Sequence, residues 1–223
     1  LFGLALTGLL FVCVLLHELG HSLVAQRFGL GVQKIILLPI GGLAMMSGKP
    51  RRPLHELLIA LAGPAVNVAL AGLLLAVALP LYGGETIAAA ARAGASDLAP
   101  SAATALLWLL AANVSLAAFN LIPAFPLDGG RVLRAAMAML TTPERATRLA
   151  AGLGQMIAVA LGFVAFFSGQ VMLGLVAVFI FFGAGRERSA EQNGSVLAGT
   201  PAGLAYNRTA LTLGSGERLS RVV

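Results

Sequence analysis

Long apolar runs recur along this chain, and they limit its folds more than any other feature. The runs span residues 1–27, 54–81, 101–122, 146–168 and 170–185. A helix of about 20 apolar residues is long enough to cross a hydrocarbon core of ~30 Å. Only 11% of the 223 residues are charged, whereas a soluble domain has about 25%. The sequence therefore predicts an all-α polytopic membrane protein with about five membrane helices.

Shorter elements are predicted between these runs. Residues 30–52 contain β-branched residues and a Gly–Gly pair, which favour a short β-hairpin at the membrane interface. Residues 82–100 are predicted to form a polar loop. The stretch 123–131, PAFPLDGGR, cannot continue a helix, because its prolines break the helix and its glycines loosen the chain. A short helix is expected over 132–140, and soluble character begins at Arg186.

The basic residues lie in short loops beside the apolar runs. They are concentrated between the first and second runs, between the third and fourth runs, and after the last run. Because Lys and Arg mark cytoplasmic loops, we expect a multi-pass protein of the cell membrane. Its 17–21 end and its C-terminal tail would face the cytoplasm. The net charge of +6 therefore does not indicate nucleic-acid binding.

The motif HELGH places three ionisable side chains inside the first apolar run. His17 and His21 are four residues apart, so they share one face of a helix and can bind a single metal ion. Glu18 follows His17 directly, where a carboxylate can act as the general base of a zinc hydrolase. Ionisable groups within a membrane helix are costly and therefore indicate a functional site.

A catalytic zinc site needs a third protein ligand, and the sequence offers two candidates. His55 lies at a membrane boundary among charged residues, where an interfacial role at a helix start is the simpler interpretation. Asp128 lies in the break at 123–131, and irregular backbone at membrane depth lines a cavity or is buried in protein. Asp128 could instead pair with Arg131 or cap the next helix.

HELGH at 17–21, AGPAVN at 62–67 and NLIPAFPLDGGR at 120–131 occur in this order. Together they resemble the site-2 protease family of intramembrane zinc metalloproteases over residues 1–185. The resemblance implies that His17, His21 and Asp128 bind one Zn²⁺ and that Glu18 is the general base. It also implies that Asn120 positions substrate or stabilises the oxyanion, although an Asn at a helix end is equally a capping or helix–helix residue.

The resemblance also implies a domain organisation. Residues 1–185 would be the metalloprotease core. Family members usually have a further membrane helix before the HExxH helix, and its absence here is attributed to truncation. The loop 82–100 is too short for the PDZ domain of some members, so the chain resembles the compact branch associated with CBS domains. Residues 186–223 would be a cytosolic linker and the start of a CBS domain, which binds adenine nucleotide when complete.

The expected function is the hydrolysis of membrane-spanning protein substrates, as in regulated intramembrane proteolysis. An unwound substrate could pair with the edge of the hairpin, where Gly41 and Gly42 would allow close approach. The hairpin could equally be an interfacial element without a substrate role. The alternatives are a metal-ion transporter, an inactive client-binding homologue, and an HExxH protease with glutamate as third ligand. Three later glutamates lie in polar contexts: Glu144, Glu187 and Glu191.

Overall fold

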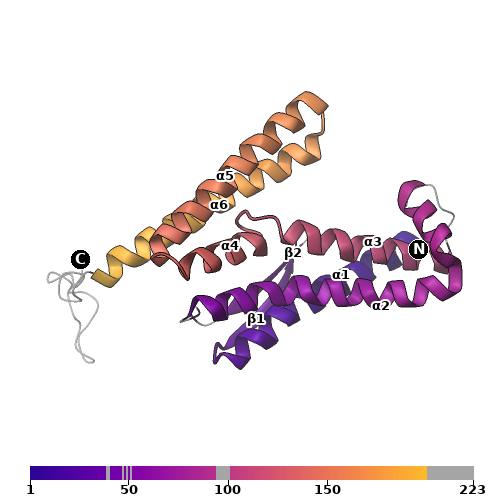
Figure 1. Ribbon diagram of the computed structural model, residues 1–223, viewed down its shortest axis with the longest axis horizontal. Helices are drawn as coiled ribbons and strands as arrows, with labels where there is room; N and C mark the ends of the chain where they lie inside the picture. Colours follow the sequence, from indigo (N-terminus) through magenta and orange to yellow (C-terminus); the bar gives the residue numbers. More distant parts are fainter. Residues whose placement is uncertain (39–40, 47, 49, 51, 94–100, 200–223) are drawn as a thin grey trace, which may run out of the picture.

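Three long helices, α1, α2 and α3, lie side by side in the computed structural model (Figure 1). They span Phe2–Arg27, Pro53–Ala93 and Ala102–Asn120. The structure describes residues 1–38, 41–46, 48, 50, 52–93 and 101–199. The predicted start of a CBS domain, within 200–223, lies outside these residues.

A two-stranded antiparallel sheet follows α1 and packs against it. Strand β1 spans Val32–Leu38 and strand β2 spans Gly41–Met46. Gly41 lies opposite Leu38 and Gly42 opposite Leu37. The predicted β-hairpin is therefore confirmed within its described residues.

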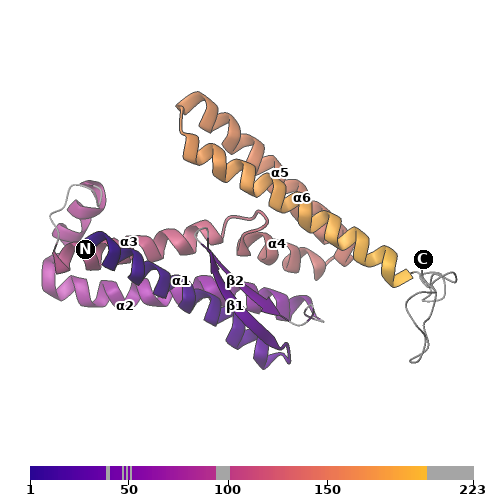
Figure 2. The same cartoon turned by 180° about the vertical axis from the view of Figure 1, so that it is seen from behind.

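The second half of the chain forms a helical hairpin that extends away from α1, α2 and α3 (Figure 2). Helix α5 spans Pro143–Ser168 and helix α6 spans Val171–Gly199, and Gly169 turns the chain between them with φ 67°. The short helix α4, Asp128–Ala138, packs against both α2 and α5. Helix α4 therefore joins the two parts of the molecule.

The turn between α3 and α4 forms a hydrophobic core with α5 and α6. Ala124, Phe125 and Leu127 are all buried. Ala124 and Leu127 pack with Ala158 of α5 and Ile180 of α6, and Phe125 packs with small residues of the same two helices. The turn therefore anchors the hairpin of α5 and α6 to the rest of the molecule.

Four described helices are long and apolar enough to cross a membrane: α1, α2, α3 and α5. Helix α6 is outside this set, and about five membrane helices were expected. Its apolar part ends at Gly185, yet the helix continues through the charged residues 186–188 to Gly199. The helix end expected near Gly185 is therefore wrong, since polarity begins there without ending the helix.

Two further boundary predictions are wrong. The polar loop predicted over 82–100 is helical as far as Ala93, because its alanine-rich part favours a helix and only Gly83 leaves the helical conformation, with φ 74°. The helix predicted over 132–140 instead begins at Asp128. The glycine pair that follows Asp128 does not loosen the chain, for the steric reason given below.

Candidate metal centre

Helix α1 presents His17 and His21 on one face, and both side chains are buried. Their Nε2 atoms lie 3.1 Å apart. Gly20, between them, lets α2 approach closely, since a Cβ at this position would lie 2.9 Å from the Ala62 carbonyl oxygen. The four-residue spacing therefore places both imidazoles at the interface of α1 and α2.

Asp128, the first residue of α4, brings a carboxylate to the same point. Its Oδ2 lies 3.1 Å from the Nε2 of His17 and 3.1 Å from the Nε2 of His21. The carboxylate is buried and faces the two histidines. The helix cap before it, Leu127, makes no side-chain cap hydrogen bond. The Oδ2 atom of Asp128 therefore contacts the two histidines. It does not take the alternative roles of an ion pair with Arg131 or a helix cap.

The glycine pair explains how Asp128 reaches the histidines. A Cβ at Gly129 would collide with the backbone carbonyls of Leu121 and Ile122, and one at Gly130 would lie 2.5 Å from the Phe125 nitrogen. Helix α4 can therefore begin directly against the preceding turn only without side chains at 129 and 130. This close approach directs Asp128 back toward α1.

A backbone carbonyl of α2 fixes the tautomer of His21. The Nδ1 of His21 lies 2.7 Å from the carbonyl oxygen of Ile59. Because a carbonyl only accepts hydrogen bonds, Nδ1 carries the hydrogen and a neutral His21 presents the lone pair of Nε2. A second hydrogen bond of this kind commonly orients histidines that bind metals.

The three converging atoms form a suitable cation site. In the metal-binding protonation state, two imidazole lone pairs and a carboxylate oxygen face one another, and only a cation between them offsets their repulsion. A tetrahedral zinc with bonds near ~2.05 Å would space its ligand atoms roughly 3.3 Å apart. The observed spacings of 3.1 Å are close to this value. The residues present therefore fit one tetrahedral metal ion.

Gly63 of α2 keeps space open beside these atoms. A Cβ at this position would collide with the Nε2 of His21 and lie 2.6 Å from the Nε2 of His17. The stretch AGPAVN thus contributes to the site through the absence of a side chain. Helix α2 thus contributes the Ile59 carbonyl and Gly63 to the site. Neither of them was identified from the sequence as part of it.

The other residues expected at the site lie outside this three-residue group. Glu18, half-buried, is next to His17 on α1. Asn120 ends α3, and its Nδ2 donates to the Leu116 carbonyl within the same helix at 3.0 Å.

Gly41 and Gly42 belong to β2, which packs on α1. His55 stacks on Phe28 with ring centroids 4.0 Å apart, which agrees with the interfacial interpretation.

The sequence profile of Peptidase family M50 matches residues 5–165. The chain belongs to this family. A zinc metalloprotease from Methanocaldococcus jannaschii is 38% identical over 187 residues, which cover 84% of this chain and 50% of that protein. The stage IV sporulation protein FB of Bacillus subtilis is 37% identical over 60 residues, or 26% of this chain and 21% of that protein.

A solved structure shows the same fold. The site-2 protease from Methanocaldococcus jannaschii superimposes with a TM-score of 0.60 and 36% identity, covering 84% of this chain and 86% of that chain. The chain nevertheless spans only about half the length of the zinc metalloprotease from that organism. The membership of Peptidase family M50 agrees with the site-2 protease resemblance that the three sequence motifs indicated.

Proposed function

We propose that this chain is an intramembrane zinc metalloprotease that hydrolyses peptide bonds of membrane-spanning proteins within or near the bilayer. The observation that carries the proposal is the convergence of His17, His21 and Asp128 at 3.1 Å spacings. Two of these residues lie in a helix that is long and apolar enough to cross a membrane. The family membership supports the same reaction class.

His17, His21 and Asp128 would hold the ion, and Glu18 would transfer protons. Zinc supplies a Lewis acid and lowers the pKa of a bound water to about 7. Glu18 takes a proton at its carboxylate and passes it to the leaving amine, so the amide bond breaks without releasing a charged amide anion. The Ile59 carbonyl keeps the His21 ring oriented throughout.

The β-hairpin and Asn120 are proposed to handle the substrate. A helical substrate must unwind before its carbonyls can react, and the edge of β2 at Gly41 and Gly42 offers backbone hydrogen bonds to an extended chain. Asn120 would turn its amide from the Leu116 carbonyl toward the substrate carbonyl. This reaction is the cleavage step of regulated intramembrane proteolysis.

The orientation of the proposed protease follows from its basic residues. The end of α1, the start of α2, helix α4 and the start of α5 lie at one end of the molecule (Figure 1). Basic residues are concentrated in these segments: Arg27, Arg52, Arg131, Arg134, Arg145 and Arg148. Since Lys and Arg mark the cytoplasmic side, this distribution supports a cytoplasmic position for the HELGH end.

The test compares metal content and cleavage in the same purified samples. The protein in detergent would be prepared as wild type, His17→Ala, Asp128→Ala and Glu18→Gln, with His55→Ala as a control histidine outside the site. We expect one zinc per chain in the wild type and the control, and none in the two ligand variants. Glu18→Gln should keep its zinc but cleave a single-span substrate on the order of 10²-fold more slowly or worse.

Two outcomes would contradict the proposal. If Asp128→Ala keeps both its zinc and its activity, the third ligand is wrong. If the wild type binds zinc and cuts no substrate, while liposomes containing it show metal flux, the site belongs to a transporter.

A further inference from the structure

One arginine joins three helices, and two of them carry residues of the metal centre. The Nε of Arg134, on α4, donates to the Glu56 carboxylate of α2 at 2.7 Å, and its Nη2 donates to the same oxygen. Its Nη1 donates to Glu187 of α6 at 2.9 Å. The guanidinium also lies 5.6 Å from the ring centroid of Phe125, in the buried turn. Arg134 is therefore held in a defined position.

The Glu56 end of this network lies on the same side of α2 as the metal centre. Ile59, whose carbonyl holds His21, is three residues after Glu56, and Gly63 is seven residues after it. Residues at i, i+3 and i+7 share one face of a helix. Arg134 is on the same short helix as Asp128, six residues further on. The ion pair therefore joins the helix that orients His21 to the helix that carries the third ligand.

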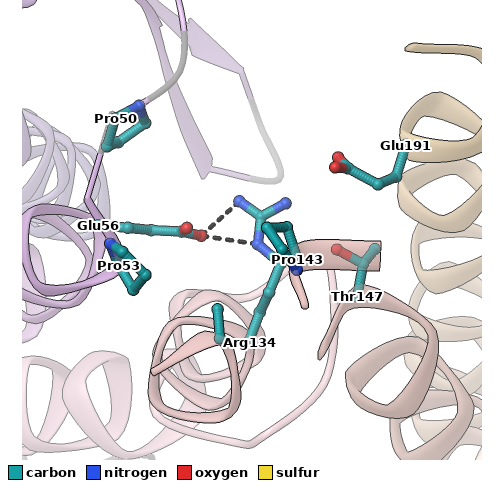
Figure 3. A pocket seen from close by; sticks show the side chains of 8 residues that line it. Pro50, Pro53, Glu56, Arg134, Pro143, Thr147 and Glu191 are labelled. Carbon is teal, nitrogen blue, oxygen red and sulfur yellow. Dashed lines mark hydrogen bonds and ion pairs between the residues drawn. The ribbon is translucent and has the colours of Figure 1, made fainter. Parts of the chain in front are cut away.

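The pair is largely shielded from water. The side chains of Arg134 and Glu56 are 13% and 17% exposed, against 36% for Glu187. Figure 3 shows Arg134 in contact with Glu56, and both line a pocket together with Pro53 and Pro143, the first residues of α2 and α5. Removing one partner of a shielded pair leaves a poorly solvated charge, so α2 and α4 would shift relative to each other.

We propose that Glu56 and Arg134 are a positioning pair for the metal centre, which holds Asp128 at binding distance from His17 and His21. This inference rests on the proposed function. The contact with Glu187 is a separate connection, because it fixes α6 and α6 contributes no residue to the three-residue group. Arg134 thus makes two contacts with different roles, one with Glu56 and one with Glu187.

The test measures zinc affinity by competition with a chelating dye, together with the unfolding temperature of the metal-free protein. We expect Glu56→Gln and Arg134→Met each to weaken zinc affinity roughly 10- to 100-fold, the range found for residues that support metal ligands. The double variant should lose little more than either single one, because both remove the same contact. Glu187→Gln is the matched control and should keep the wild-type affinity.

The outcomes separate this inference from the proposed function. If Glu56→Gln lowers the unfolding temperature but binds zinc as tightly as Glu187→Gln does, the pair is merely structural and the inference is wrong. In that case His17→Ala still loses zinc, and the proposed function stands. If the wild type binds no zinc, both the inference and the proposed function are wrong.

Discussion

At the residue scale, the metal centre depends on a position that has no side chain. Gly63 lies on α2, opposite the two histidines of α1, and a Cβ there would occupy the space beside both Nε2 atoms. The collision would involve buried rings, and the His21 ring is also held by the Ile59 carbonyl. The His21 ring therefore cannot turn away without losing this hydrogen bond.

We predict that Gly63→Ala weakens zinc binding by roughly 100-fold or more, beyond the usual effect of losing a supporting contact. Gly72→Ala, further along α2, is the matched control, because a Cβ there meets nothing within 4 Å. Both substitutions raise helix propensity by about 1 kcal/mol, so helix stability should not distinguish them. Dye competition measures the affinity, and equal affinity in the two variants would contradict the steric role of Gly63.

The sequence revealed the residues of this centre unequally. The spacing of His17 and His21 predicts a shared helix face directly, because the pattern lies within one element. The break at 123–131 made Asp128, 111 residues after His17, one candidate for the third ligand, and the family resemblance then selected it. The Ile59 carbonyl could not be predicted, since every residue has a backbone carbonyl and only the packing of α1 on α2 selects this one.

At the element scale, α4 and the turn before it form the structural support of Asp128, the proposed third ligand. A glycine pair after two prolines was interpreted as a flexible break, whereas Gly129 and Gly130 lie in the first turn of α4. Local sequence shows only that side chains are missing. It does not show whether a glycine serves an unusual backbone conformation or a close approach. Here the glycines serve a close approach, since backbone atoms of the preceding turn lie against them: Leu121, Ile122, Ala124 and Phe125.

We predict that Gly130→Ala destabilises the protein by about 1–3 kcal/mol, the usual cost of overpacking, and weakens zinc binding by displacing Asp128. The added Cβ would lie 2.5 Å from the Phe125 nitrogen, a backbone atom that cannot rotate away. Gly152→Ala on α5 has open space around its Cβ and should be neutral or slightly stabilising. Thermal unfolding in detergent checks the prediction, which a wild-type unfolding temperature for Gly130→Ala would contradict.

At the scale of the whole molecule, two helical parts meet through α4 and a buried turn. Packing of α5 and α6 around Ala124 and Phe125 joins them. The sequence predicted the apolar helices and the break between the runs 146–168 and 170–185, because hydropathy is a local signal. It did not predict that α6 continues beyond its apolar part, where Glu187 pairs with Arg134. This contact joins residues 53 positions apart, which no local pattern records.

The arrangement in a membrane leads to a labelling prediction. Thr142 precedes α5 and Ser168 ends it, and both residues are exposed. Because α5 is long and apolar enough to cross a membrane, cysteines at these positions should lie on opposite sides. Cys13→Ser provides the background, since Cys13 is the single cysteine of the chain. The substitution keeps a hydrogen-bond acceptor for the Nδ2 of Asn113.

In sealed right-side-out vesicles, a membrane-impermeant maleimide should label Ser168→Cys and not Thr142→Cys. Opening the vesicles should make both sites reactive. The basic residues at the Thr142 end are the physical reason, because they are retained on the cytoplasmic side. The reverse pattern would place the HELGH end outside the cytoplasm and contradict the orientation alone. Labelling of both sites in sealed vesicles would show that α5 does not cross the membrane, and the two helical parts would then need a different arrangement in the bilayer.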